Sequence, residues 1–205
     1  MTLDKKRHWE AVYEQKSPLD VSWYQSDPQL SLALIQSTGI TPEAALIDVG
    51  GGASLLVDRL LDSGYRNVSV LDLSAKALAY AQKRLNEMSQ RATWIEADIT
   101  AFAPSVSYDL WHDRAVFHFL TDAEDRSKYV EVLKQSVKPG GHLIIAAFAI
   151  GGPTQCSGLD IVQYDAEKLS ERLGEQFQLV EERTELHITP AKKEQQFSYF
   201  RFIKR

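Results

Sequence analysis

The chain has 205 residues, of which 44% are hydrophobic and 25% charged, and its formal net charge is −5. This length suits one globular domain, residues 1–205, with a substantial core. The acidic balance argues against a broad nucleic-acid-binding face, so we expect no nucleic-acid partner. The longest apolar run, near residues 143–150, is too short to span a bilayer, and residues 1–8 lack the apolar stretch of a signal peptide. We therefore expect a cytoplasmic protein with no membrane partner.

Cysteine and histidine usage predicts neither a disulfide nor a metal centre. Cys156 is the single cysteine, which fits a reducing compartment. The five histidines are scattered without the spacing of a zinc site. We expect no metal.

The lead-in, defined here as residues 1–40, is expected to contain two helices that lie across the mouth of a sheet. Trp9, Val12 and Tyr13 share one face of the first helix. Asp27-Pro28 opens the second helix. Polar residues surround Trp23-Tyr24, which suits a lid over a ligand, although core packing is the alternative.

Residues 44–205 alternate between strand and helix patterns. Strands are expected at 45–49, 67–71, 92–96, 108–111 and 142–148, and helices at 54–63, 75–88 and 122–137. Two further strands, 177–188 and 195–204, have no helix between them and predict an antiparallel hairpin. The fold class is therefore α/β, with a doubly wound, mostly parallel, seven-stranded sheet, helices on both faces and a C-terminal hairpin.

The segment Ala45-Leu-Ile-Asp-Val-Gly-Gly-Gly-Ala-Ser54 is the most informative, because an apolar strand carries Asp48 and runs into three glycines. These glycines are Gly50, Gly51 and Gly52. Glycines let a backbone approach a ligand closely, and a helix begins just after them. A second apolar strand ends at Asp72, where a carboxylate can hold both hydroxyls of a ribose. The pattern predicts a cofactor that contains a nucleoside.

Two details favour S-adenosylmethionine over a dinucleotide such as NAD. The dinucleotide fingerprint Gly-x-Gly-x-x-Gly requires a third glycine where this chain has Leu55. Asp48 would repel a pyrophosphate but suits an ammonium group. S-adenosylmethionine has an ammonium group and a ribose, and it has no phosphate.

Four elements in this order make the chain resemble the class I S-adenosylmethionine-dependent methyltransferases, most clearly over residues 44–147. Asp48 with its glycines resembles the first motif of the family, although Ser54 replaces the last glycine, and Asp72 resembles its ribose-binding acid. Glu96-Ala-Asp98-Ile99 resembles the segment beside the adenine, and Lys138-Pro-Gly-Gly141 the turn before the fifth strand. The resemblance implies a Rossmann-like core over residues 44–205, S-adenosylmethionine as cofactor, and methyl transfer as the reaction.

The resemblance also implies which residues contact the cofactor. Asp72 is expected to bind the ribose, Asp98 to accept from the adenine amino group, and Ile99 to cover the ring or to bond it through its backbone. Asp98 could instead cap a turn. The remaining expected cofactor contacts are Leu73, Asp113, Trp23 and Tyr24.

The segment from Asp109 to His118 is expected to follow the fourth strand and to face the cleft where acceptor and methyl group meet. His112, Asp113 and His118 are candidate general bases, while Arg114 could hold an anionic group of the cofactor or substrate. Alternatively, Asp113 and Arg114 form an exposed turn and His118 packs in a helix.

Two residues of the C-terminal half, Cys156 and His187, lie in or next to the expected connections between strands. Cys156 lies in a glycine-rich loop and could contact a soft substrate or be inert. Arg114, His118 and Cys156 are thus the candidate substrate-binding residues. His187 is expected in a solvated turn.

Methyl transfer from a sulfonium needs collinear alignment in a dry pocket, so a general base is optional and no catalytic residue is assigned. The expected acceptor is a small molecule that reacts through sulfur, oxygen or a metalloid. One alternative is a protein substrate, lysine or N-terminal amine, because His8-Trp9-Glu10 and Trp23-Tyr24 resemble the start of such a subgroup. A noncatalytic cofactor-binding module is the third hypothesis.

Overall fold

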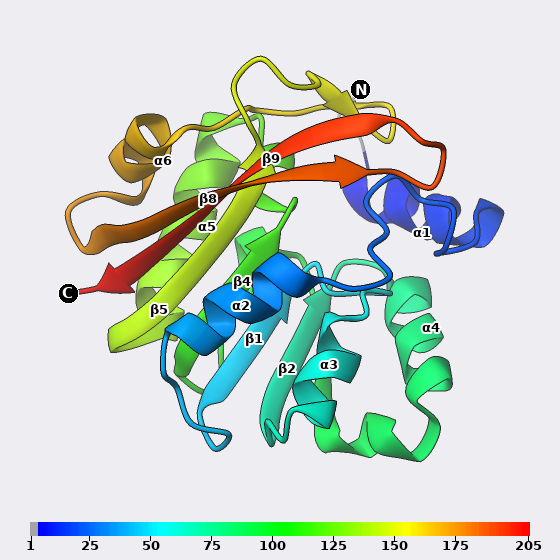
Figure 1. The fold of residues 1–205 in the computed structure, drawn as a ribbon, viewed down its shortest axis with the longest axis horizontal. Coiled ribbons are helices and arrows are strands. Elements are labelled where there is room, and N and C mark those ends of the chain that lie inside the picture. The colour runs from blue at the N-terminus through cyan, green and yellow to red at the C-terminus, as the bar shows by residue number, and fades with distance from the viewer. Residues whose placement is uncertain (1–3) are drawn as a thin grey trace.

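The computed structural model describes residues 4–205 and contains a seven-stranded sheet of order β3-β2-β1-β4-β5-β9-β8 (Figure 1). Five strands are parallel: β1 (Ala45–Val49), β2 (Asn67–Asp72), β3 (Ala92–Glu96), β4 (Tyr108–Arg114) and β5 (Val137–Phe148). β8 (Phe177–Ile188) and β9 (Glu194–Lys204) form an antiparallel hairpin, with β9 also antiparallel to β5. The predicted doubly wound sheet with its C-terminal hairpin is confirmed.

Helices cover both faces of this sheet, and each face has its own apolar core. One core joins α2 (Gln29–Ser37), α3 (Leu56–Asp62) and α4 (Ala75–Leu85) to the sheet. The other joins α5 (Ala123–Ser136) and α6 (Ala166–Leu173) to the opposite face. The central strands are apolar on both faces for this reason.

The two helices of the lead-in have different environments. α1 (Lys5–Gln15) has no buried residue, and it lies beside α4 at the end of the sheet toward which β1 and β2 point (Figure 1). The Glu10 carboxylate accepts from the backbone N–H of Ala75 at 2.6 Å. α2 packs against a sheet face instead of the mouth, because Leu34 and Ile35 are buried in the core.

Several local boundaries differ from the predicted ones. β4 continues to Arg114, so His112, Asp113 and Arg114 lie within the strand. α6 was not predicted, nor was the short pair β6 (Gln155–Cys156) and β7 (Leu159–Asp160). The solvated turn expected around His187 is wrong: the side chain is buried, and its Nε2 donates to the carbonyl of Ser22 at 2.7 Å.

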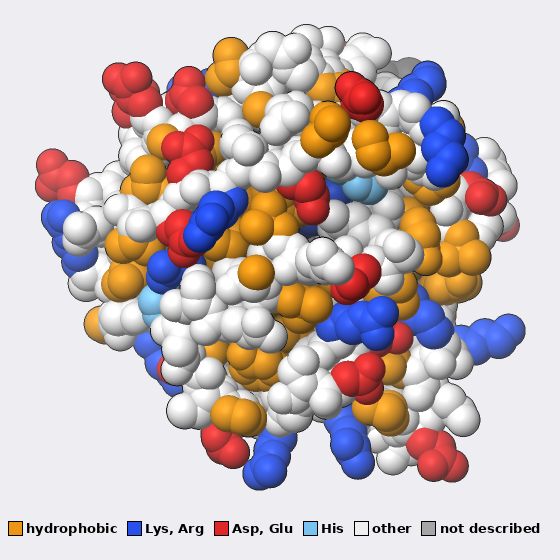
Figure 2. All heavy atoms as spheres, in the orientation of Figure 1, with side chains coloured by type: hydrophobic (Ala, Val, Ile, Leu, Met, Phe, Trp, Pro, Cys, Tyr) orange, Lys and Arg blue, Asp and Glu red, His pale blue; other side chains and the backbone are white. Residues whose placement is uncertain are grey.

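Charged side chains of both signs are mixed on the face of the molecule that Figure 2 shows. In Figure 2, lysine and arginine alternate with aspartate and glutamate across the face shown, without a continuous region of one sign. Among residues 4–205, no helix is long and apolar enough to cross a membrane. The same residues contain no group of three or more His, Cys, Asp or Glu side chains placed to hold a metal ion.

Candidate functional site

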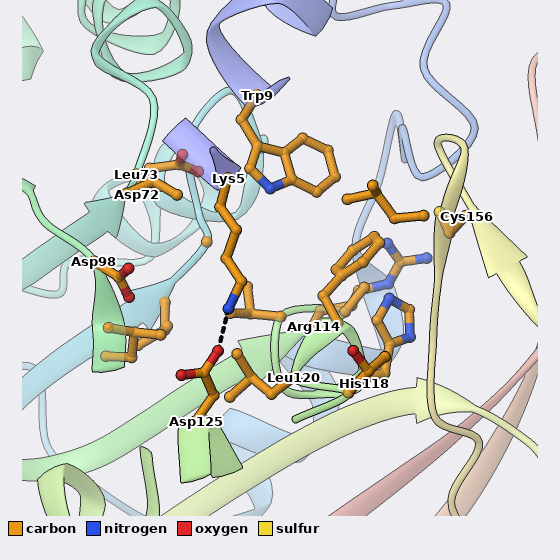
Figure 3. Close-up of a pocket in the computed structure, with 18 of the residues that line it drawn as sticks. Lys5, Trp9, Asp72, Leu73, Asp98, Arg114, His118, Leu120, Asp125 and Cys156 are labelled. Carbon is orange, nitrogen blue, oxygen red and sulfur yellow. Dashed lines mark hydrogen bonds and ion pairs between the residues drawn. The ribbon is translucent and has the colours of Figure 1, made fainter. Parts of the chain in front are cut away.

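A cavity of about 620 Å³ opens at the carboxyl ends of the parallel strands (Figure 3). Its walls come from the ends of β1, β2 and β4, the segment after β3, α1, and the region around β6 and β7. Ligands of open α/β sheets bind at this edge, and the volume suits a small molecule with a cofactor-sized partner.

The glycine loop is pressed against two carboxylates. A Cβ atom at Gly51 would lie 2.5 Å from Oδ2 of Asp48, and one at Gly52 would lie 2.4 Å from Oδ2 of Asp72. Gly50 has φ +70°, and a Cβ there would lie 2.1 Å from Cγ2 of Val116. Only glycine therefore fits this loop while both acids stay in place.

Asp48 belongs to a buried hydrogen-bond chain. Its Oδ1 is 2.7 Å from Nδ1 of His112, and Nε2 of His112 is 2.9 Å from Oγ of Ser31 on α2. Oδ2 of Asp48 is buried with no hydrogen-bond partner. A buried carboxylate oxygen without a partner can accept from a cationic group brought in by a ligand. His112, a candidate base, does not line the large cavity.

Asp72 ends β2 and lines the cavity together with Leu73. Its Oδ1 accepts from the N–H of Ser74 at 2.8 Å. Burial raises the pKa of the Asp72 carboxyl to about 7, and the nearby charges of Asp48 and Glu10 act in the same direction. The ionised carboxylate is thus poorly solvated, and hydrogen-bond donors of a ligand would stabilise it.

Asp98 and Ile99 line the same end of the cavity as Asp72. Oδ1 of Asp98 accepts from both the N–H and the hydroxyl of Thr100, at 2.9 and 2.8 Å. The carboxylate therefore caps the short 3-10 helix Ile99–Ala101 while it also faces the cavity.

Asp113 lies on the opposite side of β4 from its neighbours and outside the cavity wall. Its carboxylate accepts from the N–H of Val116 at 2.8 Å and from the hydroxyl of Tyr129 on α5 at 2.6 Å. Burial raises the pKa of Asp113 to about 6, and these donors limit the shift. Its contacts hold the turn after β4.

Arg114, His118 and Cys156 come together at the end of the cavity away from Asp72, Leu73 and Asp98 (Figure 3). Arg114 donates from Nε to the Tyr199 hydroxyl at 2.8 Å and from Nη1 to the carbonyl of Trp23 at 3.0 Å. We call this the distal end.

The two other side chains of the distal end are buried and electrically neutral. His118 is fully buried, and burial lowers the pKa of its imidazole to about 3, with the charge of Arg114 adding to the effect. Burial raises the pKa of the Cys156 thiol. Neither group is therefore an ionised nucleophile or a strong base at neutral pH.

Of the two predicted lid residues, Trp23 lines both the large cavity and a smaller neighbouring one, whereas Tyr24 lines only the smaller one. Trp23 makes edge-to-face contacts with Trp9 and Tyr13 of α1, at centroid distances of 5.6 and 6.4 Å. The smaller cavity is also lined by Asp48.

Sequence reasoning missed several residues of the wall. These are Lys5, Trp9, Phe119, Phe148 and Phe197. An ion pair between Lys5 of α1 and Asp125 of α5 crosses the cavity (Figure 3). For Trp9 the sequence gives a signal, because it shares a helix face with Tyr13. The places of the other four residues in the wall depend on long-range packing, which the sequence pattern does not show.

Comparisons with known proteins agree with this geometry. A family model for a methyltransferase domain matches residues 46–141. The eEF1A lysine and N-terminal methyltransferase of Bos taurus is 25% identical over 122 residues, which are 58% of this chain and 17% of that protein. The EEF1A lysine methyltransferase 2 of Danio rerio is 24% identical over 160 residues, which are 71% of this chain and 69% of that protein. This chain therefore spans only a small part of the first relative's length.

Solved structures share the fold over nearly the whole chain. The N-methyltransferase NodS of Bradyrhizobium japonicum, in complex with S-adenosyl-L-homocysteine, has a TM-score of 0.71 and 18% identity, covering 95% of this chain and 97% of that one. A structure from work on the conversion of a disulfide bond into a thioacetal group during echinomycin biosynthesis has a TM-score of 0.76 and 18% identity, covering 97% and 91%. The domain match identifies residues 46–141 as a methyltransferase domain, and the chain has the fold of solved S-adenosylmethionine-dependent methyltransferases, with the acid-glycine-acid arrangement at its strand ends.

Proposed function

We propose that this protein transfers the methyl group of S-adenosylmethionine to a small-molecule acceptor. The observation that carries the proposal is one cavity with two chemically different ends. Gly50, Asp72 and Asp98 line the cofactor end, with Asp48 in the smaller cavity next to it, and aromatic rings with Arg114 and His118 line the distal end.

The cofactor end matches the parts of S-adenosylmethionine. Asp72 would accept from both ribose hydroxyls, which restores the solvation that burial removes from its carboxylate. The unpartnered Oδ2 of Asp48 would accept from the ammonium group. Leu73, Asp98 and Ile99 would surround the adenine.

The distal end would receive the acceptor and exclude water from the reacting atoms. The bound cofactor supplies an electrophilic methyl group on a sulfonium. The chain's own part is to align the acceptor with that methyl group and to keep the site dry. Asp113, already bonded to Tyr129 and the turn, is not needed as a base.

One structural neighbour supports a small-molecule acceptor. Among the proteins of the same fold is a 1,6-didemethyltoxoflavin-N1-methyltransferase from Burkholderia thailandensis, with bound 1,6-didemethyltoxoflavin, at 16% identity and a TM-score of 0.71.

A protein acceptor is the second candidate function. It is favoured by the similarity to the two eEF1A methyltransferases, whose names state protein lysine or N-terminal methylation. α1 and Trp23 line the cavity, so a protein side chain would have to enter past them.

The experiment that separates the candidates uses methyl-labelled S-adenosylmethionine with a cell extract divided into small-molecule and protein fractions. We expect label in the small-molecule fraction with the wild-type protein and much less with Asp72→Asn. Label confined to protein would establish the second candidate instead. No transfer to either fraction, with intact cofactor binding, would identify a noncatalytic module.

A further inference from the structure

The distal end of the cavity has aromatic walls. Phe119 and Phe148 lie 4.5 and 5.0 Å from the His118 ring, Phe197 lies under the Arg114 guanidinium, and Trp9 and Trp23 continue the aromatic wall toward α1. Trp9 meets Phe119 edge to face with the ring centroids 5.0 Å apart, and the rings of Phe148 and Phe197 are 4.7 Å apart. Aromatic rings of this kind gain most from a flat ligand that offers both a face and an edge.

His118 provides a polar group within these walls. The side chain is fully buried, and neither Nδ1 nor Nε2 has a hydrogen-bond partner among the described residues. A neutral imidazole carries one N–H donor and one acceptor nitrogen, and leaving both unpaired in an apolar site is costly. Because His118 also lines the cavity, a ligand there can supply the missing partner.

Arg114 gives the distal end a positive potential. Its guanidinium lines the cavity and lies over the Phe197 ring at 4.4 Å. Its counter-ion, Glu185, is 3.7 Å from Nη2 but is not part of the cavity wall.

Outside the cofactor end, each carboxylate of the wall has a hydrogen-bond or ion-pair partner. Asp125 pairs with Lys5, Glu124 pairs with Lys128, and Asp122 caps α5. Asp160 is exposed and accepts from Gln155 at 2.7 Å. Asp122 and Asp160 keep their negative charge, so the preference of the distal end for an anion rests on Arg114, the cation whose charge acts on His118.

We infer that the acceptor is a planar aromatic molecule that reacts as its thiolate or phenolate anion, which rests on the function proposed above. The acceptor loses its proton to solvent before it binds. The anion accepts from the N–H of His118 and lies near the charge of Arg114. Its lone pair then forms the bond to the methyl carbon while the carbon–sulfonium bond breaks, so the two opposite charges cancel and no base is required.

Two matched pairs of acceptors test the shape and the charge separately at one neutral pH. Thiophenol is compared with 2,2,2-trifluoroethanethiol, an aliphatic thiol of similar acidity. 4-Nitrophenol is compared with phenol, which has the same aromatic ring and is a much weaker acid. Benzylamine serves as the cationic comparison.

We expect a lower KM for thiophenol than for trifluoroethanethiol, and a lower KM for 4-nitrophenol than for phenol, by about tenfold in each pair. Equal KM values within the pairs, or preferential methylation of benzylamine, would overturn the inference and leave a small-molecule methyltransferase. Transfer to protein alone would overturn both the inference and the proposed function.

The variant His118→Phe tests the role of the imidazole. Phenylalanine keeps an aromatic ring and removes two unpaired buried nitrogens, so the variant should fold. We expect KM for thiophenol to rise by about tenfold or more, with the Kd of S-adenosylhomocysteine unchanged. His142→Phe is the control, because His142 also has an unpartnered buried ring nitrogen but lines neither cavity. An unchanged KM in His118→Phe would remove His118 from the acceptor site.

Discussion

The Asp72 carboxyl should titrate near neutral pH, so its protonation should change the affinity for the cofactor. Burial raises its pKa to about 7, so below that pH the group is protonated and a weaker acceptor for ribose hydroxyls. Donation from those hydroxyls lowers the pKa again, so binding releases a proton and affinity rises with pH. We expect the Kd of S-adenosylhomocysteine to fall by about tenfold between pH 6 and pH 8, as measured by calorimetry.

Asp72→Asn is the matched control for this pH dependence, because the amide has the same shape and does not titrate. It should bind more weakly at pH 8 and show little change between pH 6 and pH 8. A wild-type Kd that is flat over this interval would exclude Asp72 as the ribose acceptor.

We expect His112 to stabilise the folded protein through its hydrogen bond with Asp48. The pair is buried, and Nδ1 of His112 lies 2.7 Å from Oδ1 of Asp48. His112→Phe leaves that oxygen unpaired and should lower the free energy of unfolding in urea by more than about 2 kcal/mol. Ser31→Ala removes only the outer bond of the chain and should cost about 1 kcal/mol. Equal midpoints for His112→Phe and the wild type would show that the pair adds nothing to stability.

The sequence was sufficient to locate Asp48 and Asp72 at strand ends, because a local apolar run followed by glycines or a helix cap determines that position. It was not sufficient to orient His112, Asp113 and Arg114. β4 extends to Arg114, and successive side chains of a strand point to opposite faces. His112 therefore meets Ser31 of α2, whereas Asp113 meets Tyr129 of α5.

Among the elements, α1 is held over the cavity by polar and aromatic contacts without a buried residue. Deleting residues 1–16 should leave a folded domain, since the buried Pro18 and Val21 are retained. It should also speed cofactor release, because Trp9, Tyr13 and Lys5 are lost from the wall. Stopped-flow displacement measures the release rate.

Hydrogen exchange on the intact protein is the companion measurement. We expect the amides of α1 to exchange more slowly once S-adenosylhomocysteine is added. An unchanged release rate in the shortened protein, with exchange in α1 indifferent to ligand, would mean that α1 is not a lid.

The remaining elements differ in how far they could be predicted. The sequence of α6 has a local helix signal, with Asp165 as cap and Leu169 and Leu173 one turn apart. The two-residue strands β6 and β7 carried none. The position of α2 depends on where Leu34 and Ile35 find apolar partners, which is a long-range property of the folded chain.

At the scale of the whole molecule, we expect the cofactor to stabilise the folded state, because its binding residues lie in segments that only folding brings together. Asp48, Asp72 and Asp98 come from the ends of three successive strands, so the unfolded chain offers no such site. A ligand that binds only the folded state at 100 times its Kd stabilises it by about 2.7 kcal/mol. For a chain of this size, we expect S-adenosylhomocysteine to raise Tm by about 5 to 11 °C.

NAD at the same concentration should leave Tm unchanged. Asp48 opposes a pyrophosphate, and Leu55, the residue that caps α3, stands where a dinucleotide site requires glycine. Asp72→Asn should reduce the shift with S-adenosylhomocysteine. A larger rise in Tm with NAD would contradict the assignment of the cofactor end, because stabilisation at equal concentration orders the two ligands by their affinity for the folded protein.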